Sequence, residues 1–250
     1  MKMTRFAPRL YLAPLAAAGI ALTSAFFLKD WFKAASPKDL HWMLSPLAHL
    51  VSLLNGHVFT FHPVYGFISV ETKTIIAPAC SGINFLLMCF CMLSLQGQLH
   101  LRRWLACLGW LLYSAAFSYL AALVINGMRI VFSMWLFQHK IEYGFLTMDR
   151  LHRICGIVLY YPALLLIFSG AAILLRRSQR RQGKGLEWVI ATVPFFCYIA
   201  GTVLVPLITQ KQYSALFWEH FFSVTVLAGG LSTFLMGRQR YSRKNHSRYP

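Results

Sequence analysis

The residues best suited to chemistry in this sequence lie at the edges of long apolar segments, and the first is a cysteine. Cys80, followed by Ser81 and Gly82, lies where a polar stretch meets the apolar segment 82–95. At the N-terminal end of a helix, the positive end of the helix dipole lowers the pKa of a thiol and favours the reactive thiolate. Ser81 and Gly82 would leave free amide N–H groups that can stabilise an oxyanion. The alternative is that Cys80 is a small buried apolar residue, which is common for cysteine.

The second candidate is an arginine inside the apolar sequence VINGMRIVF, residues 124–132. Asn126 and Arg129 are three residues apart, so they share one face of a helix. An arginine in an apolar segment costs a few kcal/mol unless it has a partner or a function. Residues 130–137 continue the apolar run, which favours a function over a side chain that only extends to the membrane surface.

The third candidate is His152, in the sequence DRLHRICG just before the apolar segment 154–175. Histidine titrates near neutral pH and can act as general acid and base, although a solvated histidine at a membrane surface is the simpler interpretation. The case for a site is the combination of the three. A Cys/His pair is the arrangement of an activated nucleophile, and an arginine nearby could stabilise charge on a carbonyl oxygen.

The elements that must position these residues are helices in a membrane. The 250 residues are 58% hydrophobic and 12% charged, about half the charged fraction of a soluble domain. Several apolar runs approach the roughly 20 residues that cross a bilayer. We therefore expect an all-α integral membrane protein with about six transmembrane helices. The expected spans are residues 10–28, 82–95, 105–125, 154–175, 188–208 and 217–236.

The segment 29–79, between the first two spans, is expected to hold two smaller elements. Residues 41–56 resemble an amphipathic helix lying in the membrane interface. Residues 57–78 alternate between apolar and polar types around a turn at Gly66, which predicts a small extracytoplasmic β-hairpin. No compact metal site and no cofactor are expected, because the histidines here are spaced too widely. They are His41, His49, His57 and His62.

The distribution of charge predicts the orientation. The formal net charge is +17, but the basic residues form short clusters between apolar runs, so anionic lipid headgroups are the expected partner and nucleic acid is not. Fifteen of the 24 Lys and Arg, and one of the seven acidic residues, lie in 1–9, 100–103, 176–187 and 237–250. The positive-inside rule then places both termini in the cytoplasm and all three candidate residues on the extracytoplasmic face of the plasma or inner membrane.

The order of these motifs resembles the exosortase/archaeosortase family of integral membrane cysteine transpeptidases. The matching elements are CSG at 80–82, NGMR at 126–129 followed by isoleucine, and His152 before a glycine-containing apolar segment. They fall within about residues 60–175. The resemblance implies substrates that are exported proteins with a C-terminal sorting signal, made of a short motif, a transmembrane helix and a basic tail.

The resemblance also implies roles for the candidate residues. Cys80 would attack the substrate carbonyl to form a thioester, and Arg129 would stabilise the oxyanion. His152 would protonate the leaving amine, and Asn126 would orient Arg129 or the backbone. Water or an acceptor amine would then resolve the thioester.

This interpretation divides the chain into three parts. They are an anchor span with an extracytoplasmic segment (1–79), a catalytic core (80–175) and a two-span extension with a basic cytoplasmic tail (176–250). Three other functions stay open. They are a transporter or channel in which Arg129 binds an anion, a non-catalytic assembly factor for export of surface polysaccharide or protein, and lipid-phosphate chemistry without the thiol. A transporter predicts polar residues at mid-membrane, whereas the polar residues here collect at one face.

Overall fold

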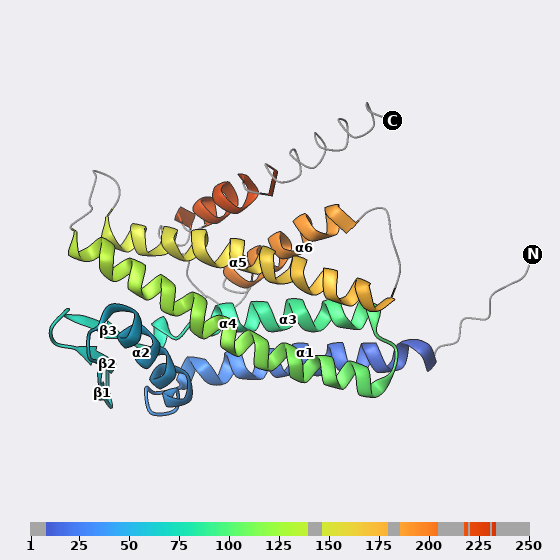
Figure 1. Cartoon of the computed structure of the whole chain (residues 1–250), viewed down its shortest axis with the longest axis horizontal. Helices are drawn as coiled ribbons and strands as arrows, with labels where there is room; N and C mark the ends of the chain where they lie inside the picture. The colour runs from blue at the N-terminus through green and yellow to red at the C-terminus, as the bar shows by residue number, and fades with distance from the viewer. Residues whose placement is uncertain are drawn as a thin grey trace, which may run out of the picture.

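The protein is a bundle of long helices with a small β-sheet at one end (Figure 1). The computed structural model describes residues 9–139, 147–179, 186–204, 218–219, 221–230 and 232–233. Four helical segments are long and apolar enough to cross a membrane, which confirms a helical membrane protein at this level. They are Leu12–Ala34, Pro78–His100, Trp104–Gln138 and Arg150–Leu175. These segments belong to α1 (Arg9–Ala34), η1 with α3 (Ile83–His100), α4 (Trp104–Gln138) and α5 (Met148–Gln179).

The last two expected spans coincide with shorter helices in the described part. Helix α6 (Leu186–Ile199) continues into a π-helix, η2 (Ala200–Leu204), and a further apolar helix covers Phe221–Gly230. Within the described residues their apolar stretches, Val193–Thr202 and Phe221–Gly230, have 10 residues each, fewer than the roughly 20 that cross a bilayer. Residues 205–217, which belong to the two expected spans and the link between them, lie outside the described residues. Six spans therefore stay a prediction.

Helix α4 is longer than expected, and this changes where Arg129 lies. The expected span ended at residue 125, but α4 continues without a break to Gln138 and has 35 residues. At 1.5 Å per residue it is about 52 Å long, against about 30 Å for a hydrocarbon core. Arg129 is therefore inside the helix, about 38 Å from Trp104 along its axis. A hydrocarbon core that began at Trp104 would end about 20 residues later, before Arg129.

The segment between α1 and α3 forms the expected helix and, in place of a two-stranded hairpin, three strands. They are α2 (His41–Asn55), β1 (Thr60–His62), β2 (Gly66–Ser69) and β3 (Thr74–Ile76). The strands form an antiparallel sheet in the order β1-β2-β3. Gly66 begins β2 and does not lie in the turn that was expected to contain it. A Cβ atom there would lie 2.4 Å from the carbonyl oxygen of Ile76, so only glycine fits where β2 and β3 pair.

An apolar core joins α2 and the sheet to the far end of α4. Leu44, Leu47 and Val51 of α2 are wholly buried, and Ile76 of β3 and Met134 of α4 pack in the same core. Each fully buried aliphatic side chain that would otherwise meet water contributes about 1.5–3 kcal/mol. This core fixes the strand that leads into residue 80 against the part of α4 that carries Arg129.

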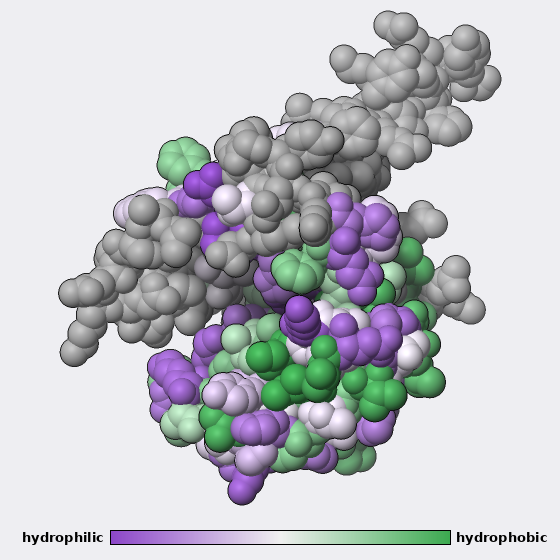
Figure 2. Space-filling view, turned by 90° about the vertical axis from the view of Figure 1, so that its left-hand side faces the viewer, coloured by the Kyte–Doolittle hydropathy of each residue, from purple (hydrophilic) through white to green (hydrophobic). Residues whose placement is uncertain are grey.

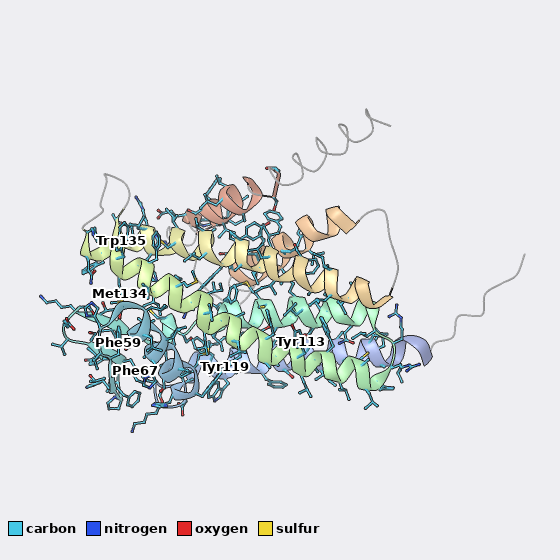
Figure 3. The ribbon with its side chains drawn as sticks, viewed as in Figure 1. Phe59, Phe67, Tyr113, Tyr119, Met134 and Trp135 are labelled. Atoms are coloured by element: carbon cyan, nitrogen blue, oxygen red, sulfur yellow. The ribbon has the colours of Figure 1, made fainter. Side chains whose placement is uncertain are left out.

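The two ends of the bundle differ in character. The connection between α3 and α4, with Arg102 and Arg103, lies at the end opposite α2 and the sheet (Figure 1). At the sheet end, Figure 3 shows Met134 of α4 close to Phe59 and Phe67. Seen from that end, hydrophilic and hydrophobic residues intermingle over the visible surface (Figure 2). The described connection 100–103 and the segment 41–79, which are expected on opposite sides of a membrane, thus lie at opposite ends of the bundle.

Candidate active site

Cys80 lies in a tight turn between β3 and α3. It is the last residue of the 3-10 helix η1 (Pro78–Cys80), and its side chain is half-buried. Gly82 follows in the left-handed conformation, with φ 80°, and is the N-cap of α3. A Cβ atom on Gly82 would lie 2.9 Å from the side chain of Asn126, so glycine is needed for both backbone and space. The cysteine therefore precedes the helix by three residues and does not open it.

Two amide groups of this turn are already used, which corrects the expectation for Ser81. The Cys80 N–H donates to the Ala77 carbonyl at 2.8 Å, and the Ser81 N–H donates to the Pro78 carbonyl at 3.0 Å. Ser81 is fully buried. These two N–H groups therefore hold the turn and are not free to bind an oxyanion.

Asn126 of α4 holds the backbone of the cysteine. Its Nδ2 donates to the Cys80 carbonyl at 2.6 Å, and the residue is fully buried. Its Oδ1 accepts from the Tyr160 hydroxyl at 2.6 Å and more weakly from Arg129 Nη1 at 3.4 Å. A buried amide with both ends paired has one orientation, because turning it over would oppose donor to donor and acceptor to acceptor. Asn126 thus links the turn that carries the thiol to the arginine.

Arg129 lies at the centre of the polar cluster. Its Nη1 donates to the Tyr160 hydroxyl at 2.7 Å, its Nη2 contacts His152 Nε2, and the guanidinium carbon lies 5.3 Å from the centroid of the Tyr160 ring. Gly156 of α5 faces the guanidinium, and a Cβ there would lie 3.6 Å from Arg129 Nε. Arg129 Nε is buried and has no hydrogen-bond partner among the described residues.

The partners of Arg129 leave its charge available. Within the described residues its contacts are with Asn126, Tyr160 and His152, and none of these is a carboxylate. A buried guanidinium N–H without an acceptor costs free energy that a ligand oxygen would recover. The geometry therefore favours a carbonyl, an oxyanion or another anion beside this side chain.

His152, in the first turns of α5, contacts two residues of α4. Its Nε2 faces Arg129 Nη2, and its Nδ1 lies 3.0 Å from Ser133 Oγ. A guanidinium only donates, so Nε2 must accept, and the neutral ring carries its proton on Nδ1, which donates to Ser133. With Arg129 in this position, the Nε2 lone pair is occupied. His152 can act as a base only when the arginine moves toward another acceptor.

A cavity of about 320 Å³ brings the thiol and the imidazole to one space. Cys80, His152 and Ser133 line it together with apolar side chains of α4, Lys73 and the three residues of β3. A volume near 300 Å³ is at the lower limit for a ligand pocket in proteins. Of the three residues that the sequence singled out, Cys80 and His152 thus line one cavity, and Arg129, which does not line it, contacts His152.

Two further residues of the cluster were not singled out from the sequence. Ser133 and Tyr160 lie within apolar stretches, where a serine or tyrosine is usually a packing residue. Their spacing is nevertheless informative. Asn126, Arg129 and Ser133 follow one face of α4 at i, i+3 and i+7, and Tyr160 is eight residues after His152 on α5. Two polar stripes on adjacent apolar helices are a signal that the two helices meet there.

The comparisons with known proteins add no relative. No protein-family model matches the chain, and neither a curated protein nor a solved structure matches it.

Proposed function

We propose that the protein is a membrane-embedded cysteine peptidase or transpeptidase that cleaves the C-terminal sorting signal of exported proteins. One observation carries the proposal. Cys80, Arg129 and His152 come from three separate segments, and a continuous set of hydrogen bonds through Asn126 connects the turn of Cys80 to the other two. The similarity of their motifs to the exosortase/archaeosortase family supplies the substrate class.

The proposed orientation places this cluster on the extracytoplasmic face of the plasma or inner membrane. Six spans and cytoplasmic termini complete the proposal, and residues 80–175 form its catalytic core. Two observations support it. The basic connection after α3 lies at the opposite end of the bundle, as the positive-inside rule requires (Figure 1). If the hydrocarbon core begins near Trp104, Arg129 lies beyond its other boundary along α4.

The chemical cycle follows from the contacts. The Cys80 sulfur attacks the scissile carbonyl carbon, and Arg129 turns from His152 to the developing oxyanion. This movement frees the Nε2 lone pair, which receives the thiol proton. When the C–N bond breaks, that proton passes to the leaving amine and a thioester stays on Cys80. Water or an acceptor amine then attacks the thioester and restores the thiol.

The cavity favours an extended peptide as substrate. Residues 73–76 all line it, although side chains of neighbouring strand residues point to opposite faces. A cavity that touches all three residues of β3, Thr74–Ile76, runs along its edge, and β3 is an edge strand of the sheet. An extended segment paired with β3 would pass directly toward Cys80, which lies four residues after Ile76 in the sequence.

A second candidate function is binding or hydrolysis of a lipid phosphate by Arg129 and His152 without the thiol. The observation that favours it is the guanidinium without a carboxylate partner among the described residues. A transporter has less support, because the polar cluster lies at one end of the bundle and not at its middle. The reactivity of Cys80 separates the two candidates.

The test compares the thiols of the chain in intact cells. We expect a membrane-impermeant maleimide to label Cys80, and we expect Cys80→Ala cells to accumulate membrane-tethered precursors of exported proteins. Cys155→Ala is the matched control, because Cys155 is a buried thiol on α5 close to Arg129 and should change neither result. Normal processing of every precursor in Cys80→Ala cells would falsify the proposal. An unlabelled Cys80 together with normal processing would favour the lipid-phosphate alternative.

A further inference from the structure

A second cavity, of about 380 Å³, lies between α1, α3 and η2, away from the cavity of Cys80. Its walls are apolar over most of their length, from Leu22 of α1 and Leu95 of α3 to Gly201 of η2. Two polar side chains, Lys29 and Asn84, lie at one end. Asn84 belongs to the first turn of α3, so the polar end of this groove is on the same side of the bundle as Cys80.

The groove opens sideways, toward the surroundings of the bundle. Leu22 and Phe26 line it and are 51% and 67% exposed, and both belong to the apolar segment Leu12–Ala34. Exposed apolar side chains on a membrane-spanning helix face acyl chains. The groove is therefore accessible from the lipid phase.

Lys29 is a cation without an anionic partner in the described part of the chain. Its ammonium donates to Asn84 Oδ1 and lies 5.8 Å from the centroid of the Phe32 ring. The neighbouring acid, Asp30, is paired with Lys33 at 3.0 Å. A half-buried ammonium at the end of an apolar groove is costly unless an anion approaches it. The groove thus combines an apolar body with one positive end.

We propose that this groove binds an anionic phospholipid, with its phosphate on Lys29 and Asn84 and one acyl chain along the apolar walls. The length agrees with an acyl chain, because the groove follows α3 from Asn84 to Leu95, about 16 Å, and one leaflet of the hydrocarbon core is about 15 Å thick. A transmembrane helix is about 10 Å across and fills on the order of 1,000 Å³ over that length, so it exceeds the groove.

The site does not depend on the proposed peptidase activity, so binding is measured directly. The full-length protein in a neutral detergent is titrated with phosphatidylglycerol or phosphatidylcholine with the same acyl chains, and bound lipid is counted by native mass spectrometry. We expect phosphatidylglycerol to bind about fivefold more tightly, which is the effect of one cation near a phosphate. Lys29→Met should remove this preference, so that the two lipids bind about equally.

Lys38→Met is the matched control, since Lys38 is an exposed lysine at the same end of the bundle that does not line the groove. It should keep the preference. Lys29→Arg keeps the charge and should also keep it, so a folding defect of Lys29→Met alone cannot imitate the result. Equal binding of the two lipids to the unmodified protein, or an unchanged preference in Lys29→Met, would overturn the proposal. If Lys38→Met also loses the preference, the preference comes from general surface charge, and the proposal is overturned in that case too.

Discussion

The Tyr160 hydroxyl is hydrogen-bonded both to Asn126, which holds the cysteine turn, and to Arg129, so it is the most informative group to remove. The hydroxyl donates to Asn126 at 2.6 Å and accepts from Arg129 at 2.7 Å, while the ring packs 4.9 Å from Phe85. Tyr160→Phe removes both hydrogen bonds and keeps the ring, so it creates almost no cavity. It tests the position of Arg129 without changing any group that touches the substrate.

The expected magnitude follows from the two bonds. A hydrogen bond to a charged group contributes about 1.5–3 kcal/mol and a neutral one about 0.5–1.5 kcal/mol. Arg129 Nη1 and Asn126 Oδ1 are already 3.4 Å apart and can approach each other in the variant, which recovers part of the lost free energy. We expect the free energy of unfolding to fall by about 2–3 kcal/mol. We expect kcat to fall about 10- to 100-fold with KM nearly unchanged, because a displaced guanidinium loses contact with the oxyanion.

Tyr161→Phe provides the control for this experiment. Tyr161 is also a buried tyrosine of α5, but its hydroxyl is hydrogen-bonded to Ser232, away from the cavity. Stability is measured by thermal unfolding in detergent, and kcat is measured by cleavage of a precursor identified in the processing test. Tyr161→Phe should lose stability and keep its kcat. If both variants lose kcat equally at equal stability, Tyr160 has only a structural role and the reasoning fails.

Two other predictions concern the turn and the imidazole. Gly82→Ala should lower the free energy of unfolding by about 2–4 kcal/mol, because a positive φ and a 2.9 Å approach to Asn126 both oppose a Cβ, and thermal unfolding checks this. Gly109→Ala, in an open position of α4, should be neutral or slightly stabilising, and an equal loss in both variants would contradict the argument. Ser133→Ala removes the acceptor of the His152 Nδ1 proton, so kcat should fall up to about tenfold and its pH profile should shift. An unchanged profile would show that Ser133 does not fix the tautomer.

The proximity of the three candidate residues could be anticipated from the sequence, because Cys80 and His152 adjoin the ends of apolar segments and Arg129 follows the end of the expected span 105–125. Segment ends on one side of a membrane are brought together when the helices pack. The roles of the individual amides could not be anticipated. The N–H groups of Cys80 and Ser81 are occupied by a 3-10 turn that Pro78 begins, and local turn geometry of this kind is not visible in a hydrophobicity pattern.

The length of α4 could not be read from the sequence for a related reason. Asn126 and Arg129 interrupt an apolar run, and such residues normally indicate the end of a span. Here Tyr160 and His152 of α5 provide their partners, so the helix continues for nine residues past Arg129. These partners belong to another helix, α5, and the position of α5 along α4 is set only when the bundle folds.

The part of α4 beyond the hydrocarbon core limits how a membrane-anchored substrate can reach the site. If the hydrocarbon boundary begins near Trp104, it ends about 20 residues later, and Arg129 stands about 8 Å above the opposite boundary. An extended chain covers about 3.3 Å per residue, so a substrate anchored in the same bilayer needs a spacer of two to three residues between its own membrane helix and the bond that is cut. Shortening that spacer by deletion would keep the scissile bond below the reach of the sulfur, whereas lengthening it would be tolerated.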